Sequence, residues 1–382
     1  MKKDLEIYLH IPFCVRKCRY CDFLSFPSNR GEREAYVKKM AEEIRSFSQK
    51  EKWAVTTIFF GGGTPSILEG NEIAFLMDTI REEFDLKEGT EISIECNPGT
   101  VDTKKLNAYR EAGVNRISFG LQSAQEKELK LLGRIHTYET FVENYEAARK
   151  CGFQNINVDL MSALPAQTAQ SWRQTLEKVL SLKPEHISAY SLMIEEGTPF
   201  FDLYEEDLKL REAGKECHLL PSENTERQMY YDTREILEQH GYFRYEISNY
   251  ARPGYECRHN IGYWERKDYA GFGLGAAGLI ENVRFKNTSD MHQYMQGEFG
   301  QEREELDQTE QMEEFMFLGL RMMRGVSRRH FFEEFGVTME SVYGIVLNEL
   351  IHQGLLEKKE DSYRLSDFGI DVSNYVLAQF LL

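Results

Sequence analysis

The chain has 382 residues, which is enough for one large domain and a smaller accessory one. Its formal net charge of −17 disfavours a general nucleic-acid binder, because such proteins normally carry a basic face. The seven cysteines do not suggest the even framework of a secreted disulfide protein. The first residues lack the apolar core of a signal peptide, and no apolar run approaches the ~20 residues of a transmembrane helix. We therefore expect a cytoplasmic protein without a transmembrane segment.

Short β-rich runs alternate with longer charged, amphipathic segments, which is typical of a parallel α/β architecture. The predicted strands are residues 5–11, 56–60, 91–95, 116–120, 155–159 and 186–191. The predicted helices between them are residues 32–49, 72–84, 102–112, 138–150 and 171–182. Six such units predict a partial (β/α)6 barrel of the TIM type rather than a closed eight-unit barrel.

The pattern changes near residue 311, where a small helical region begins. The predicted helices of this region are residues 311–324, 328–335, 339–353 and 367–381, and a hairpin is predicted at residues 355–365. Helices followed by a two-stranded wing predict a small C-terminal α+β domain that resembles a winged helix. We divide the chain into a barrel (1–235), a connecting region (236–305) and this C-terminal domain (306–382). We interpret a local basic patch in this domain as a solvated surface, and the alternative is a surface that docks a partner or acts as a lid.

Three cysteines stand close together at Cys14, Cys18 and Cys21. Thiolates are soft ligands that suit an Fe–S cluster or zinc, and both metal sites usually have four protein ligands when closed. Phe23 stands where a nearby fourth thiolate would be expected. A [4Fe–4S] cluster on three cysteines leaves one iron open for a small chelating ligand. A zinc knuckle with a distant fourth ligand is the alternative for this loop.

Polar or glycine-rich residues follow several other predicted strands. In such barrels the chemistry gathers at the carboxyl ends of the strands, so these residues predict a catalytic or binding mouth. Gly62 and Gly63 permit close backbone approach to a ligand, but the stretch lacks the Lys-Ser/Thr pair of a P-loop. Glu95 and Asp159 either cap the helices that follow or accept hydrogen bonds from a ribose or a cationic ligand.

Eight stretches together resemble the oxygen-independent coproporphyrinogen III oxidases and their relatives, a family within the radical S-adenosylmethionine (SAM) superfamily. These stretches are residues 8–23, 59–66, 95–99, 116–123, 133–136, 159–168, 245–250 and 259–264. The resemblance implies that Cys14, Cys18 and Cys21 hold a [4Fe–4S] cluster whose open iron binds SAM. It also implies that a further set of side chains and backbone groups contacts SAM. That set is Tyr8, Tyr20, Gly62, Gly63, Thr64, Glu95, Gln122, Arg134 and Asp159.

The last stretch, with His259, Tyr263 and Trp264 in a His-Asn-x-x-Tyr-Trp order, resembles the heme-chaperone branch of this family. Neutral imidazole is a good axial ligand of heme iron, so the resemblance implies heme binding at His259, with Cys257 as the alternative ligand. From spacing alone, a buried, hydrogen-bonded histidine beside core aromatics is the better interpretation. We expected the segment that carries His259 to lie at the open edge of the barrel, away from the cluster.

The resemblance implies a heme chaperone that passes heme to apo heme proteins of the respiratory chain and that receives electrons from a donor. A homodimer and peripheral membrane contact are compatible with it, and nucleic-acid binding is not expected. The alternative is a catalytic enzyme on a tetrapyrrole, either a coproporphyrinogen oxidase (dehydrogenase) or a heme-degrading methyltransferase. The oxidases carry a further cysteine where Phe23 stands, which makes decarboxylation of coproporphyrinogen unexpected. A zinc-bound structural protein is the third class.

Overall fold

The computed structural model describes residues 2–300 and 302–382; Met1 and Gln301 lie outside the described residues. A twelve-stranded sheet forms the main body, with the strand order β12-β11-β10-β9-β1-β2-β3-β4-β5-β6-β8-β7. Its six central strands are parallel. They are β1 (Lys3–Ile11), β2 (Trp53–Gly62), β3 (Asp85–Cys96), β4 (Arg116–Gln122), β5 (Ile156–Ser162) and β6 (His186–Ser191). All six predicted strands are present, and the partial (β/α)6 barrel is confirmed.

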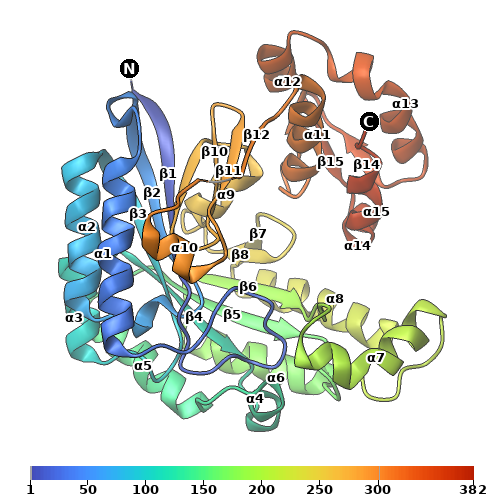
Figure 1. Ribbon diagram of the computed structural model, residues 1–382. Helices are drawn as coiled ribbons and strands as arrows, with labels where there is room; N and C mark the ends of the chain where they lie inside the picture. The colour runs from blue at the N-terminus through green and yellow to red at the C-terminus, as the bar shows by residue number, and fades with distance from the viewer. Residues whose placement is uncertain (1, 301) are drawn as a thin grey trace.

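Helices cover the outer face of this curved sheet (Figure 1). They are α1 (Arg30–Ser46), α2 (Gly70–Glu83), α3 (Thr103–Glu111), α5 (Tyr138–Lys150), α6 (Ala169–Ser181) and α8 (Glu223–Gln239). Strand β3 illustrates why the sheet has two different faces, because successive side chains point to opposite sides. Ile92 and Ile94 belong to the apolar core under the helices, whereas Glu91, Ser93 and Glu95 face the barrel interior. The barrel interior is therefore polar along this strand.

The sheet continues beyond the six predicted strands on both sides. Next to β1 lie β9 (Tyr269–Phe272), which is parallel to it, and the antiparallel β10 (Ala277–Ile280), β11 (Val283–Lys286) and β12 (Glu302–Glu305). Next to β6 lie β8 (Asn249–Ala251) and β7 (Phe243–Arg244). These strands are not predictable from the sequence, because each has only two to four residues and offers little alternation to detect.

Several short helices surround the two ends of the barrel. Near the cysteine loop are α4 (Glu126–Leu132), α7 (Pro199–Glu212) and the 3-10 turn η2 (Pro65–Ile67), whereas the 3-10 turn η1 (Lys50–Lys52) precedes β2. The amide of Phe200 in α7 donates to the carbonyl of Arg19, 3.0 Å away, so α7 holds the cysteine loop in place. Helix α9 (Arg258–Trp264) lies inside the barrel at the amino ends of the strands, and α10 (Met291–Gln296) follows the edge strands.

The C-terminal elements form a second body with its own apolar core, at the upper right of Figure 1. They are α11 (Gln308–Gly319), β13 (Val326–Ser327), α12 (Arg328–Phe335), α13 (Met339–His352), β14 (Leu356–Lys358), β15 (Ser362–Leu365), α14 (Asp367–Asp371) and α15 (Ser373–Ala378). The winged-helix-like pattern is present, with a third wing strand, β13. The first helix ends at Gly319 rather than at Arg324, because the chain turns through Gly325, at a φ of 70°, into β13. None of the described helices is long and apolar enough to cross a membrane.

Candidate functional site

A cavity of about 140 Å³ lies at the carboxyl ends of the parallel strands, and we call it the rim cavity. The cysteine loop covers it, so Cys14, Cys18 and Cys21 all line it. Eight of the residues predicted to contact SAM also line it. They are Tyr20, Gly62, Gly63, Thr64, Glu95, Gln122, Arg134 and Asp159. The fold thus brings residues from five strand ends and one loop together around a single space.

A chain of polar contacts joins two of the three cysteines to the rim. Thr64 Oγ1 lies 3.2 Å from Cys14 Sγ and accepts a hydrogen bond from Asn97 Nδ2 at 2.8 Å. Arg134 Nη2 donates to Asn97 Oδ1 at 3.0 Å, and its Nη1 donates to Cys18 Sγ at 3.6 Å. We call these five residues the rim bracket. It fixes the spacing of the two thiols from the ends of β2 and β3.

The residues of the loop fit an Fe–S cluster. A Cβ added at Gly63 would lie 2.9 Å from the carbonyl oxygen of Phe13 and 3.1 Å from Cys14 Sγ, so only glycine allows this approach to the loop. Among the described residues, no three Cys, His, Asp or Glu side chains converge on one metal-ion position. The thiolates of a cubane cluster bind different irons and need not converge on one point. Three thiols that line one shared cavity are therefore compatible with such a cluster.

Neither acidic residue of the rim caps a helix. Glu95 accepts a hydrogen bond from the amide of Gly62 at 3.1 Å, and Asp159 accepts from Ser118 Oγ at 2.8 Å and from Asn157 Nδ2 at 2.7 Å. Burial raises the pKa of Glu95 to about 8, and the nearby charge of Asp159 adds to the effect. A cationic ligand in the cavity would favour the ionised form of Glu95, so these carboxyl groups are suited to bind a positively charged cofactor.

Two residues outside the predicted set complete the rim. Asn97 is the centre of the rim bracket, and Tyr190 Oη donates to Gln122 Oε1 at 2.9 Å. Gln122 itself has a φ of 70°, an uncommon conformation for a residue other than glycine that often occurs at functional sites. The signal that could have found both is their position at strand ends, since Asn97 directly follows β3 and Tyr190 is the last residue but one of β6.

Tyr8 does not line the rim cavity. Its hydroxyl lies 3.1 Å from His10 Nδ1, and its ring stacks against Phe59 with a centroid separation of 6.3 Å. The ring of His259 packs against both, with its centroid 5.0 Å from that of Phe59 and 6.4 Å from that of Tyr8. Tyr8 thus belongs to an aromatic cluster next to the rim cavity, and its contact with SAM stays a prediction.

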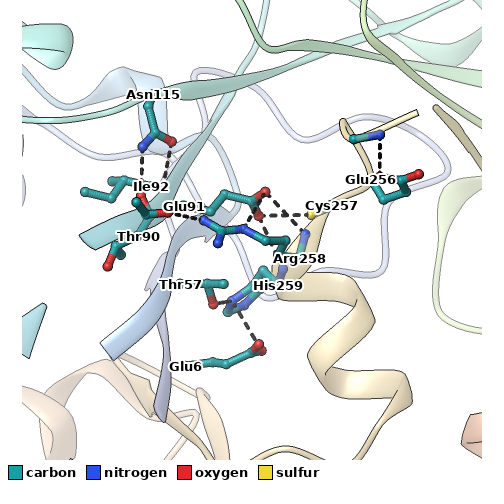
Figure 2. A network of polar contacts seen from close by, with 12 residues as sticks. Glu6, Thr57, Thr90, Glu91, Ile92, Asn115, Glu256, Cys257, Arg258 and His259 are labelled. Atoms are coloured by element: carbon teal, nitrogen blue, oxygen red, sulfur yellow. Dashed lines mark hydrogen bonds and ion pairs between the residues drawn. The ribbon is translucent and has the colours of Figure 1, made fainter. Parts of the chain in front are cut away.

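His259 lies at the floor of the barrel, in helix α9, and not at an open edge as expected (Figure 2). Its Nδ1 lies 2.6 Å from Thr57 Oγ1 and its Nε2 lies 3.0 Å from Tyr263 Oη, so both ring nitrogens have partners. Burial, with a smaller contribution from Arg116, lowers the pKa of His259 to about 3, which keeps the imidazole neutral. Cys257 is also fully buried, and its thiol donates to Glu91. Either side chain could bind heme iron only after α9 leaves the floor.

Comparisons with known proteins give the family. The model of the radical SAM superfamily matches residues 8–179, and that of the HemN C-terminal domain matches residues 306–372. The heme chaperone HemW of Lactococcus lactis is 37% identical, over 100% of this chain and 98% of its own length. Those of Bacillus subtilis and Escherichia coli are 37% and 34% identical, over 98% or more of each chain. The chain belongs to the HemW family.

Membership of the HemW family, and so of the radical SAM superfamily, implies a [4Fe–4S] cluster and SAM. Among solved structures, the coproporphyrinogen III oxidase HemN of Escherichia coli matches with a TM-score of 0.83 and 23% identity. The match covers 100% of this chain and 90% of that one, and at this identity it establishes the fold alone. This chain and HemN thus share the fold of the barrel and the C-terminal body.

Proposed function

We propose that the chain is a heme chaperone that holds a [4Fe–4S] cluster on Cys14, Cys18 and Cys21, binds SAM beside it, and delivers heme to apo respiratory proteins. The observation that carries the proposal is the rim bracket, which positions two of the cysteines over a cavity lined by glycines and carboxyl groups. The relatives' name, heme chaperone, supports the heme part. We place the protein in the cytoplasm, where a reducing environment protects thiolates.

Each rim residue has a role that its contacts support. Thr64 and Arg134 orient the thiols, and Gly62 and Gly63 allow the backbone to approach the cofactor. Glu95 and Asp159 would accept hydrogen bonds from the amino group and ribose hydroxyls of SAM, with Gln122 held by Tyr190 beside them. When bound and reduced by a donor, the cluster supplies the electron for SAM cleavage in radical SAM chemistry.

One observation at the rim favours a carrier over an enzyme that converts the tetrapyrrole. Conversion would require the tetrapyrrole to lie beside SAM, because the reacting atoms must come within contact distance. The exposed Phe23 stands at the mouth of the rim cavity, where the oxidases have a further cysteine.

The experiment begins with protein purified and reconstituted without oxygen. We expect about four irons per chain, a reduced-cluster EPR signal that SAM changes, and transfer of bound heme to an apo heme protein. Cys18→Ser should abolish the EPR signal, whereas Cys151→Ser, whose thiol lies away from the rim cavity, should not. A zinc-loaded, iron-free protein with full heme transfer would overturn the cluster assignment. Protein that binds no heme would overturn the chaperone.

A further inference from the structure

Two adjoining cavities lie at the amino ends of the strands, opposite the rim. The larger has about 830 Å³ and lies between β3, the segment that precedes α9, and the turn that follows α11. The smaller has about 320 Å³ and lies between the end of α9 and the C-terminal body. Met322 and Arg324 line both, and we call the two together the floor recess. Its size is typical of a site for a small molecule.

The walls of the floor recess are held in place by specific contacts. Glu91 anchors the first turn of α9, because its two carboxylate oxygens accept hydrogen bonds from the amides of Arg258 and His259, each at 3.2 Å (Figure 2). On the other side, the amide of Met323 donates to the carbonyl of Tyr245 at 3.0 Å. These bonds join the barrel, α9 and the C-terminal body, so the recess is a built feature of the fold.

The lining combines apolar surfaces with three arginines, Arg258, Arg266 and Arg324, and three carboxylates, Glu91, Glu256 and Glu265. Arg266 is buried in an ion pair with Glu314, and each of the three carboxylates already has a partner within the chain. Ile261, Met322 and Met323 offer aliphatic and thioether surface, and Trp264 adds an aromatic wall. Arg258 and Arg324 reach the same recess, with side chains 54% and 59% exposed. The buried Nε1 of Trp264 has no hydrogen-bond partner among the described residues. Such a lining is complementary to a flat apolar molecule that carries carboxylates at its edge.

Arg324 can exchange partners without leaving a charge unpaired. It forms an ion pair with Glu265, and Glu265 also pairs with Lys267 Nζ at 2.9 Å. A carboxylate that takes Arg324 therefore leaves Glu265 with its second partner. Because both ion pairs lie at the surface, the exchange has a small electrostatic cost.

We propose that the floor recess is the heme site, with the propionates on Arg258 and Arg324 and the macrocycle against Met322 and Trp264. This inference rests on the proposed chaperone function. Strand β3 carries Glu91 at the floor and Glu95 at the rim, and at ~3.3 Å per residue they are roughly 13 Å apart. Heme in the recess would thus lie out of contact with SAM, which gives a physical reason for its release unchanged.

The test is a titration of the full chain with heme b, followed by its Soret absorption. Arg324→Glu should weaken heme binding at least tenfold, because it replaces a charge-assisted contact by repulsion. Arg329→Glu is the matched control, since it makes the same charge change at an exposed residue that does not line the recess. It should leave the affinity within about twofold, and Cys18→Ser at the rim should do the same.

A second probe changes the ligand as well as the protein. Heme dimethyl ester, which lacks the free carboxylates, should bind wild type at least tenfold more weakly than heme, and this difference should be smaller in Arg324→Glu, which keeps only Arg258 for the propionates. Equal losses in Arg324→Glu and Arg329→Glu, or equal affinities of wild type for heme and its ester, would overturn the recess as the heme site. So would heme binding that is lost in Cys18→Ser but kept in Arg324→Glu. Wild type that binds no heme would instead overturn the proposed function itself.

Discussion

Glu6 offers a direct test of whether α9 closes the floor of the barrel in solution. The residue lies on β1 and is 2% exposed, and its Oε2 lies 3.7 Å from Nδ1 of His259. No described residue donates a hydrogen bond to that oxygen. Burial raises the pKa of Glu6 from 4.5 to about 9, although the charge of Lys267 partly opposes the shift. The carboxyl group is therefore neutral in the folded protein at pH 7.

The magnitude follows from the two pKa values. Because the pKa is raised in the folded state, the contribution of Glu6 to stability is fully present below pH 4.5 and declines as the pH rises toward 9. Each pH unit in this window costs about 1.4 kcal/mol, so the loss at pH 7.5 is at most about 4 kcal/mol. Above pH 9 the folded form ionises too, and the loss no longer grows.

The assay compares Glu6→Gln with wild type by urea unfolding of the cluster-free chain between pH 5 and pH 9.5. The glutamine is neutral at every pH, so its advantage in free energy of unfolding should grow by about 1.4 kcal/mol per pH unit across the window. Glu196→Gln, at an exposed position, should show no such slope. A difference in the free energy of unfolding between Glu6→Gln and wild type that does not change with pH would refute the reasoning. It would mean that Glu6 is solvated and that α9, with His259, does not occupy the floor.

Four further changes test the rim and two of the glycines of the chain. Cys18→Ser should remove the ~4 irons per chain that a cubane cluster contributes, whereas Cys151→Ser should keep them. Iron analysis after anaerobic reconstitution measures both, and an equal loss of iron in the two variants would contradict the ligand assignment. Asn97→Leu removes the centre of the rim bracket, so the affinity for SAM should fall about tenfold while the iron content is retained. An EPR titration with SAM measures this affinity, and an unchanged affinity would show that the bracket does not contribute to SAM binding. Gly62→Ala should lower the free energy of unfolding by about 1–3 kcal/mol, since Gly62 has a φ of 110° and its Cβ would lie 2.7 Å from the ring of His10. Gly344→Ala, in a helix with open space around it, should instead raise that free energy by about 0.5–1 kcal/mol in the same denaturation experiment.

The barrel was predictable because its strands must be apolar on the face that the helices cover. Ile117 and Phe119 on β4 are fully buried in that core, and such runs between amphipathic segments are visible in sequence. The rim residues were predictable for a related reason, since the carboxyl ends of parallel strands meet at one end of a barrel. Asn97 escaped the predicted set, because its role depends on side-chain contacts with Thr64 and Arg134 that spacing does not reveal.

The floor could not be predicted in the same way. Whether an imidazole is free to bind iron depends on its partners, and Thr57, the partner of His259 Nδ1, lies 202 residues earlier in the chain. Helix α9 has only seven residues, too few for a clear periodicity. The floor recess likewise depends on the turn after α11 lying against the segment before α9, a contact between two bodies that no local pattern encodes.

The most direct test of the account is the fate of heme during SAM chemistry. The reconstituted protein is loaded with heme and reduced without oxygen in the presence of SAM, and an apo heme protein is then added as the acceptor of the heme. The tetrapyrrole is recovered afterwards, and its mass and absorption spectrum are measured. A heme chaperone with separate rim and floor sites predicts heme that is recovered unchanged and an acceptor that regains its spectrum. A tetrapyrrole of altered mass, formed together with 5′-deoxyadenosine in proportion to the heme supplied, would contradict it and identify an enzyme.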